Sequence, residues 1–331
     1  MLTTVTFLAG LLLLIGGGES LVRGASRLAA GFGISPLVVG LTVVAFGTSA
    51  PELAVSVRSV LDGRVDLALG NVVGSNLFNV LFILGLSALI TPLAVERQLI
   101  RQEVPVMLGA SLLLLVLALD GAIGRPDGIL LFALAVVYTV VLIRQARAAE
   151  GDDAGIAAPA EPAPPGPSAS PGEGATWQDR RAVQLGLVVA GVVLLVVGAQ
   201  LLVAAAVTIA QAVGLDERVI GLTIVAAGTS LPEVATSVVA AVRGQRDIAI
   251  GNVVGSNIFN ILCVAGASAA LAPTPLPVGR ETLAVDLPLT VLVAAACLPI
   301  FFTGRRVARP EGALLLAVYV GYTSWAILSG G

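Results

Sequence analysis

Long apolar stretches follow one another along this 331-residue chain, and the short segments between them hold nearly all of the charge. Each stretch is roughly twenty residues long, which is enough for a helix to cross a bilayer. The pattern predicts an all-α polytopic membrane protein with ten transmembrane helices, near residues 4–22, 35–61, 67–91, 103–120, 127–144, 183–205, 216–242, 248–271, 283–302 and 311–329.

One segment, residues 145–182, departs from this pattern. It holds six of the eighteen prolines, together with Gly, Ser, Ala and acidic residues. Such a composition cannot bury enough apolar surface to order itself. We therefore expect a disordered linker at 145–182 between two five-helix units, residues 1–144 and 183–331.

The two units are related in sequence by a shift of 181 residues. GLTVVAFGTSAPE (40–52) matches GLTIVAAGTSLPE (221–233) at ten of thirteen positions. LGNVVGSNLFN (69–79) matches IGNVVGSNIFN (250–260) at nine of eleven positions. Chance does not produce this agreement, so the chain contains an internal duplication of five helices.

Five helices per unit is an odd number, so the second unit enters the membrane from the opposite side. Thirteen arginines fall in the loops after spans 1, 3, 5, 7 and 9, and five fall on the other side. The positive-inside rule then places the linker in the cytoplasm and both termini outside the cell membrane. The predicted fold is a pair of inverted-topology repeats.

Composition narrows the function. The chain is 57% apolar and 12% charged and has no histidine, so the commonest proton relay and transition-metal ligand is missing. Cys263 and Cys297 are isolated in apolar runs, which indicates neither a disulfide framework nor a zinc site. An intramembrane hydrolase using Ser49 or Glu52 would lack a neighbouring base. We expect no enzyme activity, no cofactor, no nucleic-acid partner and no obligatory protein partner beyond the lipid bilayer.

The duplicated motifs carry the candidate chemistry. Glu52 and Glu233 lie deep within predicted spans 2 and 7, where an ionised side chain costs at least about 2.5 kcal/mol and normally faces a cavity. A lone Glu could serve packing alone, but two at equivalent repeat positions favour a functional site. Pro51 and Pro232 cannot donate to the carbonyl four residues back, so we predict breaks in both helices that free backbone carbonyls.

The second motif adds one polar stripe to each of spans 3 and 8. Asn71, Ser75 and Asn79 are spaced four apart, and so are their mates in the second repeat, Asn252, Ser256 and Asn260. Asn also stabilises helix contacts in membranes, so we interpret Asn71 and Asn252 as packing or bridging residues and assign the other four to the site. Asn76 and Asn257 point elsewhere by helical geometry and are left unassigned.

These groups form an all-oxygen constellation if the halves meet at their pseudo-twofold axis. Hard cations prefer such a site, and Ca²⁺ takes six to eight oxygen ligands. Two carboxylates nearly neutralise one Ca²⁺ but repel each other when the site is empty, so the site prefers one divalent ion or several monovalent ions. The same carboxylates cannot serve both ions at once, which predicts obligatory exchange.

GTS(A/L)PE with GNVVGSNxFN in both halves resembles the calcium/cation antiporter superfamily, specifically its sodium/calcium exchanger branch of the prokaryotic type. The resemblance implies that Glu52 and Glu233 bind both Ca²⁺ and Na⁺, and that Thr48 and Thr229 contribute to the Ca²⁺ site. It implies flanking Na⁺ sites lined by Ser49, Ser230, Ser75, Ser256 and the carbonyls of Ala45 and Ala226, with Asn79 and Asn260 in a central layer. Some family members have Asp at position 260; here both central amides are neutral, which leaves the occupant of that layer open.

Two other functions remain. A proton-coupled Ca²⁺ exchanger of the same superfamily usually has a further acid in the second motif, where Ser and Asn here favour Na⁺. A passive cation channel would not require a site that is less stable empty than filled. The function we predict is secondary active exchange of Na⁺ for Ca²⁺ by alternating access at a midplane site.

Overall fold

The computed structural model describes residues 2–155, 181–212 and 226–329. The first half consists of α1 (Leu2–Phe32), α2 (Pro36–Val39), the π-helix η1 (Gly40–Val44), α3 (Ala45–Thr48), α4 (Ala50–Leu61), α5 (Val65–Leu77), the π-helix η2 (Phe78–Leu84), α6 (Gly85–Ile90), β1 (Leu93–Ala94), the π-helix η3 (Leu99–Glu103), α7 (Val104–Leu117), the 3₁₀ turn η4 (Ala118–Asp120), β2 (Ala122–Ile123) and α8 (Arg125–Gly155). The second half consists of α9 (Arg181–Ala212), α11 (Ala226–Gly228), α12 (Leu231–Val242), α13 (Arg246–Phe259), the π-helix η7 (Asn260–Ala265), α14 (Gly266–Leu271), β3 (Leu276–Pro277), the π-helix η8 (Thr282–Asp286), α15 (Leu287–Phe302), the 3₁₀ turn η9 (Thr303–Arg305), β4 (Arg306–Val307) and α16 (Arg309–Ser329).

The chain is a helical membrane protein, as the hydrophobic pattern predicts. Seven of the described helices are long and apolar enough to cross a membrane, and the bent pair Pro36–Thr48 and Ala50–Leu61 forms a possible eighth span. Of the two remaining predicted spans, the described part of 216–242 contains α11 and α12 with a break between them, and 311–329 lies in α16. Residues 216–225 of the predicted span 216–242 lie outside the described part of the chain.

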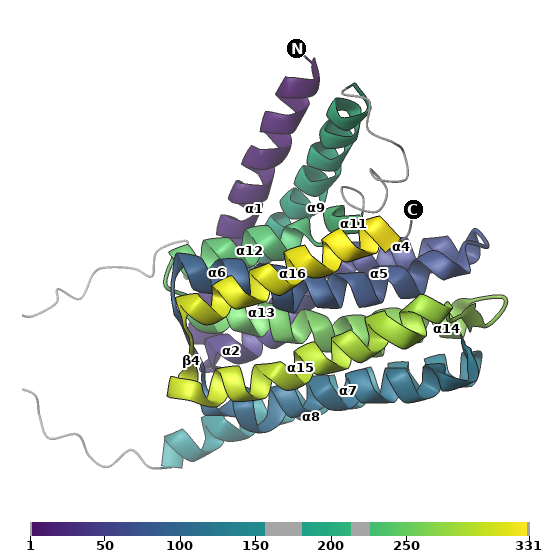
Figure 1. Ribbon diagram of the computed structural model, residues 1–331. Helices are drawn as coiled ribbons and strands as arrows, with labels where there is room; N and C mark the ends of the chain where they lie inside the picture. Colours follow the sequence, from purple (N-terminus) through teal and green to yellow (C-terminus); the bar gives the residue numbers. More distant parts are fainter. Residues whose placement is uncertain (1, 156–180, 213–225, 330–331) are drawn as a thin grey trace, which may run out of the picture.

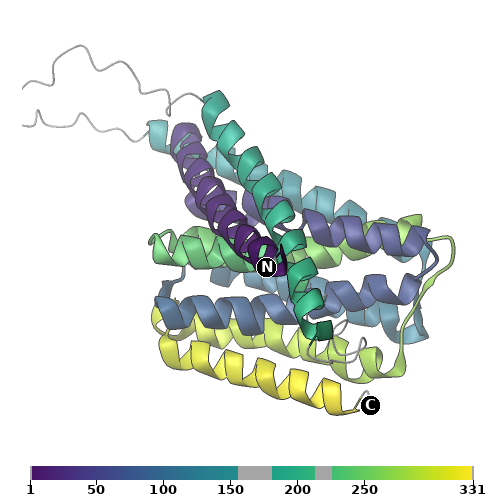
Figure 2. The same cartoon turned by 90° about the horizontal axis from the view of Figure 1, so that it is seen from above.

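Helices α1 and α9 form a pair that stands apart from the remaining helices. In Figure 1 they lean together at a steep angle to the bundle, and in Figure 2 they cross over its face. Five glycines allow this pairing, because a Cβ added to any of them would come within 3.0 Å of a backbone atom of the other helix: Gly10, Gly17, Gly24, Gly191 and Gly198. The two backbones therefore approach as closely as small residues allow in membrane helix pairs.

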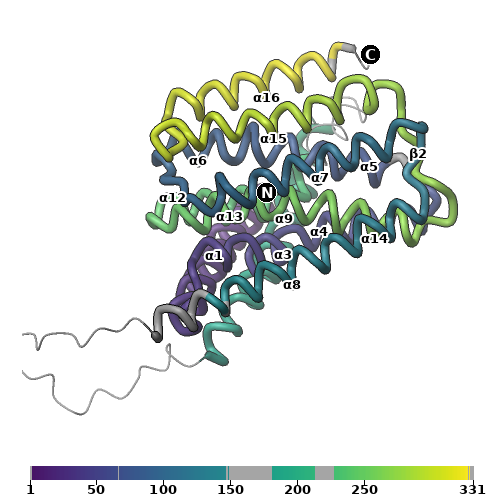
Figure 3. Tube along the Cα trace, turned by 90° about the horizontal axis from the view of Figure 1, so that it is seen from below, coloured from purple at the N-terminus to yellow at the C-terminus, as the bar shows by residue number. Residues whose placement is uncertain are grey.

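The helices with the second motif form the centre of the bundle. The α13–α14 span is 94% buried within the protein and the α5–α6 span 72% buried, whereas the α8 span is only 17% buried. Figure 3 shows the face opposite α1 and α9, with α16 along one edge and α8 along the other. Polar side chains on α5 and α13 therefore face protein rather than lipid.

Two short antiparallel ribbons join the halves outside the helices. Leu93 pairs with Val307 in the β1–β4 ribbon, and Ile123 pairs with Leu276 in the β2–β3 ribbon. Each ribbon takes one strand from each half of the chain. The connecting segments thus hold the two repeats together independently of the helix contacts.

The structure differs from the sequence prediction at the linker boundary. Helix α8 continues to Gly155, about ten residues beyond the predicted start of the linker at 145, and α9 begins at Arg181. Residues 145–150, QARAAE, are all good helix formers, so they continue the preceding helix. Residues 156–180 lie outside the described part of the chain.

Candidate functional site

The predicted breaks are present in both halves. Ser49 separates α3 from α4 with φ −84° and ψ 7°, and the two helical segments differ in direction by 42°. Ser230 precedes α12 with φ −89° and ψ 7°. Glu52 and Glu233 lie in the first turns of the helices that follow, and both are 0% exposed. A helix N-terminus favours a nearby carboxylate, which partly offsets the cost of burying it.

Each glutamate contacts a serine of the opposite half. The Ser49 hydroxyl donates to Glu233 Oε1 at 2.8 Å, and the Ser230 hydroxyl donates to Glu52 Oε1 at 2.8 Å. The hydroxyl oxygens of Ser230 and Ser75 lie 3.1 Å apart, within hydrogen-bond distance. The constellation is therefore shared, because neither half can complete it alone.

A second pair of reciprocal contacts connects the threonines with the first asparagines of the polar stripes. Thr48 donates to Asn252 Oδ1 at 3.0 Å, and Thr229 donates to Asn71 Oδ1 at 3.3 Å. The amide nitrogens of Asn252 and Asn71 each donate at 2.9 Å to a serine hydroxyl of their own half, on Ser237 and Ser56. Both ends of these amides are engaged by protein, which agrees with their interpretation as bridging residues.

Other oxygens at this centre are buried without a hydrogen-bond partner among the described residues. They are Glu52 Oε2, Glu233 Oε2, Asn79 Oδ1, Asn260 Oδ1 and Ser256 Oγ. An unpartnered buried polar atom is costly, and here the atoms are of the kind that hard cations prefer. The donor set therefore fits a cation with oxygen ligands.

The structure places most of the predicted site residues together in this buried region. Thr229 is half-buried, while Thr48, Ser49, Ser75 and Ser256 are buried. The Ala45 carbonyl already accepts the Ser49 N–H at 3.0 Å, and the Thr48 hydroxyl oxygen lies 3.3 Å from it. Ala226 begins α11, and its side chain lies outside the described part of the structure.

No salt bridge found among the described residues involves Glu52 or Glu233. The salt bridges of the described residues lie at the surface, between Glu19 and Arg23 or Arg243 and between Asp62 and Arg58 or Arg64. Each glutamate accepts a hydrogen bond from the serine three residues before the other glutamate, which places the two carboxylates near each other. Two carboxylates this close in a low-dielectric interior repel each other, so positive charge from outside the protein would stabilise the pair.

Two further central residues, Asn76 and Asn257, were expected to point elsewhere. The Asn79 amide nitrogen donates to Asn257 Oδ1 at 3.0 Å, and the Asn257 amide nitrogen donates to the Asn76 carbonyl at 3.3 Å. The sequence spacing could have placed Asn76 beside Asn79, since the two are three residues apart and share a helix face. Asn257 and Asn260 have the same spacing.

The structure also contains a buried acid that the motifs did not indicate. Glu103 is 0% exposed, and it accepts hydrogen bonds from the Tyr138 hydroxyl at 2.7 Å and from the Gln98 amide at 2.9 Å. A similar contact occurs in the second half, where the Tyr322 hydroxyl donates to Asp286 at 2.9 Å. Each of these acids ends a π-helix at the start of α7 or α15, away from the broken helices.

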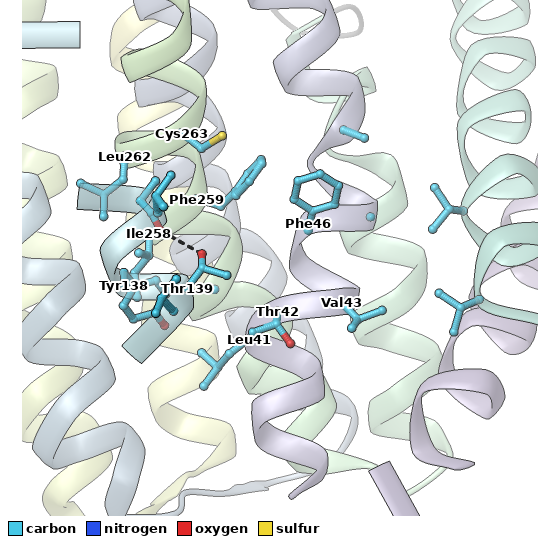
Figure 4. A pocket seen from close by; sticks show the side chains of 18 of the residues that line it. Leu41, Thr42, Val43, Phe46, Tyr138, Thr139, Ile258, Phe259, Leu262 and Cys263 are labelled. Carbon is cyan, nitrogen blue, oxygen red and sulfur yellow. Dashed lines mark hydrogen bonds between the residues drawn. The ribbon is translucent and has the colours of Figure 1, made fainter. Parts of the chain in front are cut away.

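The described residues also form an open pocket that is separate from the two buried glutamates. It has a volume of about 690 Å³ and lies between α3, α8, α9 and α13. Figure 4 shows its apolar lining, including Phe46 and Phe259, whose rings meet edge to face with centroids 5.1 Å apart. Neither Glu52 nor Glu233 lines it, so it offers no carboxylate to a cation.

The chain is similar to known proteins over nearly its whole length. The sodium/calcium exchanger protein family matches residues 2–144 and 183–328. Inner membrane protein YrbG of Escherichia coli (strain K12) is 35% identical over 98% of this chain and 96% of its own length. Sodium/calcium exchanger MaX1 of Methanosarcina acetivorans is 32% identical over 96% of this chain and 97% of its own length. The solved sodium-calcium exchanger NCX_Mj, soaked with Na⁺ and Ca²⁺, superposes with a TM-score of 0.80 at 31% identity, covering 99% of this chain and 98% of that one. This chain belongs to the sodium/calcium exchanger protein family.

Proposed function

We propose that this protein is a secondary active antiporter that exchanges Na⁺ for Ca²⁺ at one site shared by its two halves. The reciprocal contacts of Glu52 with Ser230 and of Glu233 with Ser49 support this proposal most directly. Each contact engages one carboxylate oxygen and leaves the other buried without a protein partner. The ions named for MaX1 and NCX_Mj support the choice of Na⁺ and Ca²⁺.

The charge of the site explains why exchange is obligatory. Two carboxylates balance one Ca²⁺ or two Na⁺, but they repel each other when no cation is bound. Glu52 and Glu233 are fully buried, so the protein has to change conformation before either ion can enter or leave. A conformational change with an empty site is unfavourable because it leaves both charges uncompensated in the protein interior.

In this proposal the neutral oxygens divide between the two ions. Thr48 and Thr229 add oxygens to the Ca²⁺ position. The flanking Na⁺ positions are lined by Ser49, Ser230, Ser75, Ser256 and the carbonyls of Ala45 and Ala226. Asn79 and Asn260 form the central layer.

Alternating access is assigned to movement of α1 and α9 against the remaining helices. The two helices pack closely against each other, and α1 also contacts α12, which carries Glu233. A rigid pair lying across the site can close one side while opening the other, as inverted-repeat transporters do. We place the protein in the cell membrane with residues 145–182 in the cytoplasm and both termini outside, on the strength of the arginine distribution.

Transport into proteoliposomes tests the proposal. Radioactive Ca²⁺ uptake is measured with and without an outward Na⁺ gradient for the wild type, Glu52→Gln and Glu233→Gln. Uptake should require the gradient and should be abolished in both variants, because each removes half of the site's charge. Glu103→Gln is the matched control, since Glu103 is equally buried but lies outside the site, and its half-saturating Ca²⁺ should stay that of the wild type.

The same vesicles distinguish the other couplings. Uptake driven by a pH gradient without Na⁺ would replace the proposal with proton coupling. Ca²⁺ flux without any counter-ion would indicate a channel. Exchange retained in both glutamate variants would refute the assigned site while leaving the family membership intact.

A further inference from the structure

The two central helices carry four buried asparagines, Asn76, Asn79, Asn257 and Asn260, and the side chains of Asn79 and Asn257 contact each other across the two halves. Asn79 and Asn260 are 0% exposed, Asn76 is 1% exposed and Asn257 is 3% exposed. They lie where α5 continues into η2 and where α13 continues into η7. All four side chains are therefore buried from solvent.

A side-chain amide presents two different faces to an ion. Its oxygen accepts and can coordinate a cation, while its NH₂ group donates and repels one. The two ends are nearly equal in size, so shape alone does not decide which end points into the site. An amide in a cation site needs a neighbour that fixes its orientation.

The geometry points to Asn257 as that neighbour. Asn257 Oδ1 accepts the NH₂ group of Asn79 at 3.0 Å, which engages the end that would repel a cation. Asn79 Oδ1 is left buried without a partner among the described residues. We propose that Asn257 is a positioning residue that holds the Asn79 amide with its oxygen toward the bound cation. This inference rests on the proposed exchange function.

The orientation of Asn257 is itself determined by the backbone. Its NH₂ group donates to the main-chain carbonyl of Asn76 at 3.3 Å, and a carbonyl can only accept. Asn257 must therefore direct its oxygen toward Asn79. The chain from carbonyl to Asn257 to Asn79 fixes the direction of every donor in the series.

The equivalent contact in the other half is absent from the described structure. Both polar atoms of the Asn76 side chain, and both of Asn260, are buried without a hydrogen-bond partner. Asn76 is therefore a natural control: it has the same residue type, the equivalent repeat position and the same degree of burial as Asn257, but no positioning bond. Asparagine that merely packs helices together would give the two residues equal importance.

The test compares Asn257→Leu, Asn257→Asp and Asn76→Leu in proteoliposomes. Half-saturating Na⁺, half-saturating Ca²⁺ and the maximal exchange rate are measured separately, and thermal stability in detergent shows that each variant folds. Asn257→Leu removes the acceptor, so at least one half-saturating concentration should rise about tenfold, the effect of losing one oriented hydrogen bond. Asn257→Asp keeps the oxygen that accepts from Asn79 and, in its protonated form, a donor for the Asn76 carbonyl, so it should be less impaired than Asn257→Leu.

The control decides between positioning and packing. Asn76→Leu should change both half-saturating concentrations less than Asn257→Leu does. The inference is overturned if Asn257→Leu leaves both concentrations unchanged, if Asn257→Asp is as impaired as Asn257→Leu, or if Asn76→Leu has an equal effect. A wild type without Na⁺-dependent uptake would instead refute the proposed function, so the two failures are distinguishable.

Discussion

The close contact between α1 and α9 leads to a prediction that two alanine substitutions can test. A Cβ added to Gly191 would lie 2.6 Å from the backbone nitrogen of Leu21 and 2.9 Å from the carbonyl oxygen of Gly17. Gly186 lies on the same helix, and a Cβ added there would meet nothing within 4 Å. Gly191→Ala and Gly186→Ala thus introduce the same methyl group, with and without a collision.

The size of the effect follows from these distances. Ordinary van der Waals contact begins at 3.4 Å, so the methyl group at Gly191 forces the two backbones apart by roughly 1 Å. Forced overpacking of this kind typically costs about 1–3 kcal/mol. Both substitutions also gain up to about 1 kcal/mol of helix propensity. The difference in stability between the two variants therefore isolates the collision and should be about 1–3 kcal/mol.

Stability is measured as the fraction of monodisperse protein that survives heating in a mild detergent. Gly186→Ala should match or exceed the wild type, and Gly191→Ala should melt at a lower temperature. Exchange should also slow in Gly191→Ala, because a loosened helix pair no longer moves as one unit. Equal melting of the two variants would show that α1 and α9 are not held together by backbone contact.

Two further predictions concern acids outside the ion site. Tyr138→Phe removes one of two donors to the buried Glu103 and should lower stability by about 1–3 kcal/mol. Tyr322→Phe should cost less, because its partner Asp286 is more exposed than Glu103. Equal melting temperatures for both variants and the wild type would contradict this account. Burial, and next the charge of Asp247, raise the pKa of Glu96 above its ordinary value. The protonated form of Glu96 therefore contributes stability that is complete below about pH 4.3 and is lost as the pH rises through the raised pKa. Glu96→Gln should therefore raise the melting temperature at pH 8 but not at pH 4, and a constant difference across that range would count against the linkage.

Much of this architecture could be predicted from local sequence. Apolar length gave the helices, because a bilayer demands twenty apolar residues whatever the neighbours are. The repeat shift identified Glu52 and Glu233 as equivalent, and Pro51 and Pro232 located both breaks, because proline removes a donor regardless of tertiary context. The end of α8 was misplaced, since a helix of good formers continues beyond the membrane without an apolar signal.

The contacts between the halves were decided only by the tertiary structure. Sequence spacing associates Thr48 with Glu52 on one helix, yet the serine that contacts each glutamate comes from the other half. The same holds for Asn257, whose side-chain oxygen Oδ1 orients Asn79 across the interface between the central helices. Periodicity describes which residues share a face of one helix, but hydrogen bonds between helices depend on how two faces approach and rotate. That arrangement is set by the packing of the whole bundle, and no local pattern contains it.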